Sequence, residues 1–429
     1  MRRSRFAQAG FLLLFVAGCS SAGTPVPTVA SPTNASPGPT AVESSTAPLT
    51  AAPSQPPSPS PSAVSTPATT ASGWQQVPAQ PALTAAQTTL VVWTGQRFLA
   101  AGTLDDGSTG ILDSSDGQAW HSQPGFGPGS RVQGFAVGPA GILAVGAQDS
   151  DARSWFSADG LTWKAAPETA ALRPAKNDSL EMEGAVPTPG GWLAVGQEQL
   201  SCQFDCGSWA AVRADVWTSK DGLTWIREPA SSALANAGMT GVVKAGPGYV
   251  AAGGAPDKAT GTEGPVHAAI WTSADGSTWT RVKDGPVFHA PPGTDQTFGV
   301  AISGIAASGG RLVAVGSVAS QGDVGSALAW WSDDGRAWQR ATGERFLYGQ
   351  LWHVASVPGG FIGAGPSGPD SCLGGIWSSA DGKAWSCVAA DPPFDNTVAT
   401  DAAASPTLEL VVGYDPSGGA SILWTRPVP

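Results

Sequence analysis

Short apolar runs separated by glycine-rich and Asp-Gly turns recur about every 50 residues between residues 73 and 429. One copy holds "GFAVG" (134–138) and then "ILAVG" (142–146), and another holds "AAIWTSADG" (268–276). Apolar runs of this length with such turns between them predict antiparallel strands joined in hairpins. Each repeat therefore predicts four short strands, named A to D in chain order, and the chain is expected to be all-β.

Two signatures mark the repeat. The first is a heptapeptide between strands C and D, found as "SSDGQAW" (114–120), "SADGLTW" (157–163), "SKDGLTW" (219–225), "SADGSTW" (273–279), "SDDGRAW" (332–338) and "SADGKAW" (379–385). Its serine and aspartate can accept hydrogen bonds from backbone N–H groups of their own turn. We therefore expect structural roles for Asp116, Asp159, Asp221, Asp275, Asp334 and Asp381.

The second signature is strand B, an apolar run that ends in glycine. It occurs as "RFLAAG" (97–102), "GILAVG" (141–146), "GWLAVG" (191–196), "GYVAAG" (248–253), "RLVAVG" (311–316), "GFIGAG" (360–365) and "LELVVG" (408–413). Tryptophans recur at two fixed places, one closing the heptapeptide and one two residues before its serine. Large rings at one place in every repeat favour packing between sheets over the alternative of stacking on a sugar.

The ends of the folded region fit together. The run "GWQQV" (73–77) matches the residues directly after a heptapeptide, and "SILWTRP" (421–427) matches the residues directly before one. Four-stranded units of about 50 residues predict a β-propeller. We expect seven four-stranded antiparallel blades over 73–429, the last closed by one N-terminal strand and three C-terminal strands.

The heptapeptide resembles the Asp-box, or bacterial neuraminidase repeat, whose pattern is Ser/Thr-x-Asp-x-Gly-x-Thr-Trp. In this chain glycine follows aspartate directly, and only three copies have threonine before tryptophan. The resemblance implies a sialidase-like propeller fold. It implies no activity, since the repeat occurs in sialidases, other glycoside hydrolases, sortilin-type receptors and a photosystem assembly factor.

The N-terminus predicts export. Three arginines precede the apolar "FLLLFVA" (11–17), and "VAGC" (16–19) resembles the lipobox of bacterial lipoproteins. The resemblance implies a signal peptide over 1–18 and acylation of Cys19, with a simple secreted protein as the alternative. Residues 19–72 are rich in Ser, Thr, Pro and Ala and predict a disordered tether. The expected location is extracytoplasmic, with a lipid anchor in the cell membrane.

Charge and cysteines refine this picture. The formal net charge is −11 and no basic stripe exists, so a nucleic acid is not an expected partner. An even number of cysteines in an exported chain predicts two disulfides, and a zinc site is the rival interpretation. The cysteines other than Cys19 are Cys202, Cys206, Cys372 and Cys387.

Loop lengths indicate where binding occurs. Length variation is confined to the B–C and D–A connections, which share the face opposite the heptapeptides, and variable loops on a rigid scaffold commonly bind ligands. The longest are 164–183, 197–215, 226–239, 254–267 and 283–300. Aromatic and arginine residues on this face suit protein or glycan recognition, although the rings could instead fill small loop cores. The candidate binding residues are Phe204, Trp209, Arg213, Asp215, Arg345, Tyr348 and Trp352.

The catalytic set of a sialidase is not found. No Arg-Ile-Pro motif occurs, and Tyr249 occupies an apolar strand-B position. Three pairs of acids lie on or near the variable face, Asp105/Asp106, Asp149/Asp151 and Glu181/Glu183, and no spacing singles out one of them. They keep another glycoside hydrolase as the alternative. His289 and His353 look isolated, so no metal and no cofactor are expected. The sequence favours a monomeric binding or scaffold module for a protein or an envelope polysaccharide.

Overall fold

The computed structural model describes residues 73–175, 178–199, 212–246, 248–256, 266–292, 299–319, 325–368, 371–388, 394 and 397–428. Strands dominate this part of the chain. Its helices are α1 (Pro81–Thr84) and the short 3-10 turns η1 (Pro286–Phe288) and η2 (Leu373–Gly375). None of these helices has the length or apolarity needed to cross a membrane.

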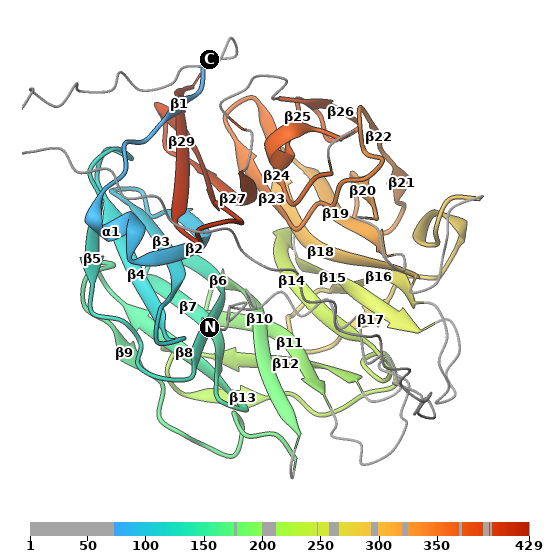
Figure 1. Cartoon of the computed structure of the whole chain (residues 1–429). Helices are drawn as coiled ribbons and strands as arrows, with labels where there is room; N and C mark the ends of the chain where they lie inside the picture. Colours follow the sequence, from blue (N-terminus) through green and yellow to red (C-terminus); the bar gives the residue numbers. More distant parts are fainter. Residues whose placement is uncertain are drawn as a thin grey trace, which may run out of the picture. The chain divides into compact units, whose positions relative to one another are not determined.

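The strands pair as four-stranded antiparallel units that follow one another around a centre (Figure 1). In chain order the units are β2 (Ala86–Trp93), β3 (Phe98–Leu104), β4 (Thr109–Ser114) and β5 (His121–Gln123); β6 (Ser130–Gly138), β7 (Gly141–Gln148), β8 (Asp151–Ser157) and β9 (Lys164–Ala165); β10 (Ser179–Thr188), β11 (Gly191–Gln199), β12 (Val212–Ser219) and β13 (Trp225–Arg227); β14 (Gly238–Ala245), β15 (Gly248–Pro256), β16 (Val266–Ser273) and β17 (Thr280–Arg281); β18 (Gly299–Ser308), β19 (Arg311–Ala319), β20 (Ser326–Ser332) and β21 (Gln339–Arg340); and β23 (His353–Val357), β24 (Gly360–Ala364), β25 (Ile376–Ser379) and β26 (Ala384–Cys387). The propeller fold is confirmed.

The last unit joins the two ends of the folded region. Strand β1 (Gln75–Gln76) pairs with β29 (Ser421–Pro427), which continues through β28 (Leu408–Tyr414) to β27 (Val398–Ala404). The predicted closure by an N-terminal strand is therefore confirmed. Two additions to the repeat occur in the described residues: β22 (Thr342–Gly343) pairs parallel with β26, and one parallel residue pair, Val266 with Gly299, links β16 to β18.

The heptapeptide turns have the predicted hydrogen bonds. In the turn at 273–279, Ser273 Oγ accepts the N–H of Gly276, and Asp275 Oδ1 accepts the N–H groups of Ser277 and Thr278. The other copies repeat this arrangement. These bonds lower the pKa of Asp275 to about 2. The aspartates therefore make the hydrogen bonds expected within their own turns.

The tryptophan of strand C is buried in these units and anchors the variable face. Trp330 is fully buried, and its indole N–H donates to the carbonyl of Val287 in the preceding D–A connection, with an Nε1–O distance of 2.7 Å. Trp217, Trp271 and Trp377 make the same kind of bond. The core interpretation of these rings is therefore correct.

An arginine of strand D stacks on the tryptophan in several units. The guanidinium carbon of Arg340 lies 5.2 Å from the ring centroid of Trp330, and Arg281 lies at the same distance from Trp271. Each arginine also donates to backbone carbonyls of the same D–A connection. Each tryptophan–arginine pair therefore fixes a variable loop to its blade.

One predicted disulfide lies in the described residues. Cys372 and Cys387 are bonded, with a Cα–Cα distance of 5.4 Å, and they bracket the turn that contains Asp381. The zinc alternative is therefore wrong for this pair. The other predicted pair, Cys202 with Cys206, lies outside the described residues, as does Cys19.

Candidate binding site at the central cavity

The innermost strands enclose a cavity of about 210 Å³. Its walls come from β2, β6, β10, β14, β18, β23 and β27, the A strand of each unit, and these strands face the centre in Figure 1. Every A strand starts where a D–A connection, or for β2 the chain that follows α1, enters the ring. The end of the cavity at which the A strands begin therefore lies on the face with the variable connections.

A β-bulge occurs at the same place in six of these strands. In β10 the register shifts after Met182, opposite Gly196 of the strand-B signature, and a Cβ on Gly196 would overlap the carbonyl oxygen of Glu181. The glycine that ends each strand-B run thus makes room for the bulge. The extra residue of the bulge is polar in all six strands: Thr89, Gln133, Glu183, Thr240, Ser303 and Thr400.

Two of these residues join neighbouring blades. Thr240 Oγ1 donates to the carbonyl of Ile302 in the next A strand, with an O–O distance of 2.8 Å. Thr400 does the same toward Thr88 across the closure of the ring. A small hydroxyl is sufficient to link neighbouring A strands in this way. Gln133 and Glu183 have longer side chains than this link requires.

Gln133 and Glu183 belong to a polar cluster shared by two blades. Gln133 Nε2 donates to Glu181 Oε1 at 3.0 Å, and Gln197 Nε2 donates to Glu183 Oε1 at 2.9 Å. The Nε of Arg131 lies 3.6 Å from Glu181 Oε1. Of this cluster, Gln133 and Glu183 line the cavity, so the cluster contributes one amide and one carboxyl group to its wall.

The carboxyl groups of this cluster are shifted toward the neutral form. Burial and, after it, the nearby charge of Glu181 raise the pKa of Glu183, and with the opposing effects of Gln197 and Arg131 included the pKa is about 8. Burial also raises the pKa of Glu181, against the effect of Arg131 and Gln133. Glu183 lines the cavity and is partly exposed, but the surrounding walls limit solvation of its charge. Shifts of this kind are frequent at functional sites.

Another buried carboxyl group lies on the wall formed by β27. Asp401 Oδ2 accepts the N–H of Val91, and Oδ1 accepts that of Ala402. His353 Nδ1 lies 3.8 Å from Asp401 Oδ1. Burial raises the pKa of Asp401, and the charge of His353 opposes this. His353 is therefore part of the cavity wall, and the expectation that it is isolated is wrong.

Arg213 and Asp215 lie in strand β12, and not in a loop. Both belong to an ion-pair network with Glu198 and Arg227. Glu198 is fully buried and also accepts the N–H of Ala175 at 2.6 Å. The network holds strands β11 to β13 and the connection near residue 175 together. A binding role for Arg213 and Asp215 stays a prediction.

The segment around residue 346 is divided between core and surface. Phe346 packs edge-on against Trp377, with ring centroids 6.0 Å apart. Leu347 and Tyr348 are 59% and 44% exposed, and Tyr348 and Arg345 both have positive φ. Trp352, also a predicted binding residue, is partly buried and its indole N–H donates to Gln350 Oε1 at 2.9 Å. Residues 344–345 and 347–348 of this segment are exposed, and Leu347 and Tyr348 are its large exposed apolar side chains.

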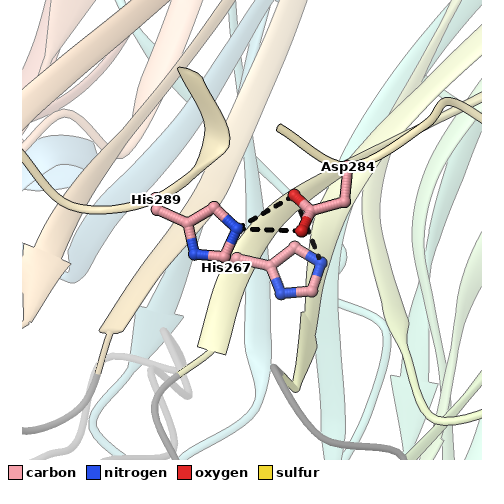
Figure 2. Close-up of side chains that lie close together, drawn as sticks. All are labelled: His267, Asp284 and His289. Carbon is pink, nitrogen blue, oxygen red and sulfur yellow. Dashed lines mark hydrogen bonds and ion pairs between the residues drawn. The ribbon is translucent and has the colours of Figure 1, made fainter. Parts of the chain in front are cut away.

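Two predicted residues of the binding face, Phe204 and Trp209, lie outside the described residues. Tyr249 is buried in strand β15, as its position in the repeat predicts. His289 is not isolated, because its ring lies beside His267 and Asp284 on the face of the variable connections (Figure 2).

A larger hollow of about 1000 Å³ lies on the opposite face, between the units of β14–β17 and β18–β21. It is lined by A–B turns and heptapeptide turns, including Asp275 and Asp334. The carboxylates of both residues already accept backbone N–H bonds within their own turns. The volume of this groove is larger, but the carboxyl groups whose pKa values are raised by burial lie at the central cavity.

Sequence reasoning missed the polar ring at the bulges. The signal was present as a polar residue directly before a glycine in strand A: "QG" (133–134), "EG" (183–184), "TG" (240–241) and "SG" (303–304). In these strands the glycine lies against the neighbouring A strand, where a Cβ would be tightly crowded. A polar residue followed by glycine thus marks the bulge that faces the centre.

No family model and no curated protein sequence matches this chain. Solved structures similar to it include the phage phi92 endosialidase, at 12% identity and a TM-score of 0.44 over 83% of this chain and 68% of that one. Trypanosoma rangeli sialidase in complex with sialic acid gives 11% identity and a TM-score of 0.43 over 76% and 58%. The same sialidase with a difluorosialic acid gives 12% identity and a TM-score of 0.39 over 84% and 56%.

Proposed function

We propose that this protein is a binding module that recognises a cell-envelope polysaccharide with the face of its B–C and D–A connections. The observation that supports this best is the cluster of Gln133, Glu181, Glu183 and Gln197 at the central cavity. The protonated carboxyl of Glu183 and the side-chain amides each offer both a donor and an acceptor, as sugar hydroxyls require. A cluster poor in net charge suits a hydroxyl-rich ligand better than an ionic one.

The size of the cavity limits what can enter. Pockets for drug-sized ligands measure roughly 300–1,000 Å³, whereas this one measures about 210 Å³. It has room for one terminal group of a chain, with the remainder lying across the variable connections. The proposed ligand is therefore an end or a branch of the polysaccharide.

Location forms part of the same proposal. The resemblance of residues 1–19 to a lipoprotein leader supports acylation of Cys19 and a tether over 19–72, so that the ring acts outside the cytoplasm. The Cys372–Cys387 disulfide supports an oxidising compartment. We also infer that the repeats belong with the Asp-box propellers, and the shared Ser and Asp hydrogen bonds of the turns support this.

Affinity electrophoresis of the full chain tests the proposal. The detergent-solubilised protein would be run through gels that contain bacterial envelope polysaccharides. Wild type is expected to be retarded, with Glu183→Ala and Gln133→Ala weakening binding at least about tenfold because each loses polar contacts to a buried ligand. The matched control is Asp105→Asn, an exposed acid outside the cavity. Equal mobility of all variants in every gel contradicts the proposal.

A glycoside hydrolase is the second candidate, and the raised pKa of Glu183 favours it. A carboxyl with a pKa of about 8 is protonated at neutral pH and can donate a proton to a leaving oxygen. Fluorogenic glycosides separate the two functions. Turnover by wild type that is lost in Glu183→Gln would identify an enzyme, whereas binding without turnover would identify the binding module.

Protein recognition stays open as a further outcome. Exposed Leu347 and Tyr348 form a small apolar surface on the variable face. A partner captured from solubilised envelopes by wild type and lost in a Leu347→Ser, Tyr348→Ser double variant would indicate a protein ligand. The same double variant should bind polysaccharide normally if the central cavity is the site.

A further inference from the structure

Two histidines and one aspartate meet on the face of the variable connections. They are not part of the central cavity that we propose as the polysaccharide site. His267 lies at the start of β16, Asp284 in the connection that follows β17, and His289 directly after η1. Figure 2 shows both imidazole rings directed at the carboxylate of Asp284. His267 and His289, 17 and 5 positions from Asp284 in sequence, thus meet it where β16 lies beside the connection that leads to β18.

The ligand atoms are close enough to share one ion. His289 Nε2 lies 3.0 and 2.9 Å from the two carboxylate oxygens of Asp284, and His267 Nε2 lies 4.0 Å from Oδ1. One potential ligand atom from each residue lies within 4.8 Å of the others. Zinc with ligands at about 2.0–2.1 Å requires separations of roughly 3.3 Å in a tetrahedral arrangement. Changes of up to about 1.5 Å in the distances between ligand atoms therefore complete the geometry.

The backbone that carries these residues is fixed. Arg340 donates to the carbonyls of Val287 and His289, and Trp330 donates to Val287. Phe288, between them, is buried in the core. A site held by such outer contacts loses little freedom when an ion binds.

The side chains are also held. The rings of His267 and His289 stack with centroids 5.0 Å apart, and His267 is only 8% exposed. Asp284 Oδ1 accepts the N–H of Gly285 at 2.7 Å.

We propose that His267, Asp284 and His289 bind one divalent transition-metal ion, with zinc the best match. Imidazole nitrogen is a ligand for zinc, copper, iron and nickel, whereas calcium and magnesium take oxygen ligands. Two histidines and one carboxylate supply three positions and leave a further one open for water or a ligand group. The ion would place a Lewis acid on the variable face, independently of the central cavity.

The experiment is a Zn²⁺ titration of the full chain after chelator treatment and alkylation of free thiols, followed by calorimetry. Wild type and His121→Ala, an exposed histidine elsewhere, are expected to bind one equivalent. His267→Ala, His289→Ala and Asp284→Asn are expected to weaken binding by about tenfold or more. One equivalent that persists in these variants, or no binding by wild type, overturns the proposal.

Histidine NMR of the wild-type chain covers the case in which a variant does not fold. The chain has four histidines, so each ring signal can be assigned. Added Zn²⁺ should shift the signals of His267 and His289 and leave those of His121 and His353 unchanged. Shifts confined to His121 or His353, or no shift at all, contradict the site.

Discussion

The guanidinium of Arg340 donates a hydrogen bond to the backbone carbonyl of His289, with an Nη2–O distance of 2.6 Å. The donor belongs to the outermost strand of one blade, and the acceptor belongs to the connection that enters the same blade. The same guanidinium stacks on Trp330, a core residue. The position of a surface histidine is therefore set by the core of the ring.

Replacing Arg340 tests this coupling. Arg340→Met should lower the free energy of unfolding by about 2 kcal/mol, because a cation–π contact and two charged hydrogen bonds are lost. Urea unfolding measures the change, and Arg336→Met, on an exposed heptapeptide position, is the matched control. Equal losses in the two variants would show that the stacked arginine has no special role.

Asp275→Ala tests the heptapeptide turn. The loss of two N–H bonds to a carboxylate is expected to cost about 1 kcal/mol, a modest value because the group is exposed. The folded pKa of about 2 is below the ordinary 3.8, so this stabilisation is complete above pH 4 and disappears as pH falls toward 2. Thermal unfolding of both proteins between pH 2 and 6 should converge at the acidic end. A difference that persists at pH 2 would contradict the pKa argument.

Glu183 predicts the opposite pH dependence. Its folded pKa of about 8 lies above the ordinary 4.5, so the folded state retains a proton that the unfolded state loses. Stability should therefore fall as pH rises from 4.5 to 8, by an amount on the order of a few kcal/mol. Glu183→Gln, which stays neutral, should flatten this decline in urea unfolding. If the free energy of unfolding of the variant falls with pH as steeply as that of wild type, a group other than Glu183 causes the decline.

The disulfide is expected to stabilise the ring. Cys372 and Cys387 are separated by 15 positions, and closing a loop of that length contributes about 3 kcal/mol in the chain-entropy description. A Cys372→Ser, Cys387→Ser double variant should lose this amount in urea unfolding without reductant. Reductant should then lower the free energy of unfolding of wild type, but should not lower that of the double variant, which lacks this disulfide. Similar effects on both would indicate that another bond dominates.

Much of the fold follows from local chemistry in the repeat. Asp-Gly turns, the glycine after strand B and the two tryptophan positions each act within one blade or between neighbours, so their roles can be inferred from a single copy. The closure by Gln75 and Gln76 follows because the chain ends supply complementary parts of one repeat.

The functional groups are harder to infer, because they depend on side chains from different elements. Glu183 becomes significant only when a bulge turns it toward Gln197 and Glu181 in the central cavity. His267 and His289 are 22 positions apart and meet because a tryptophan and an arginine hold the intervening connection. Neither arrangement follows from periodicity along the chain.

The closure of the ring also has a mechanical consequence. Strand β1 has two residues paired with β29, and Trp74, which directly precedes it, is fully buried beneath Arg426. Because residues 1–72 continue directly into this strand, tension applied through them reaches β1 before any other strand. If residues 19–72 are the proposed tether, the two-residue pairing of β1 with β29 and the buried Trp74 are expected to yield first under load.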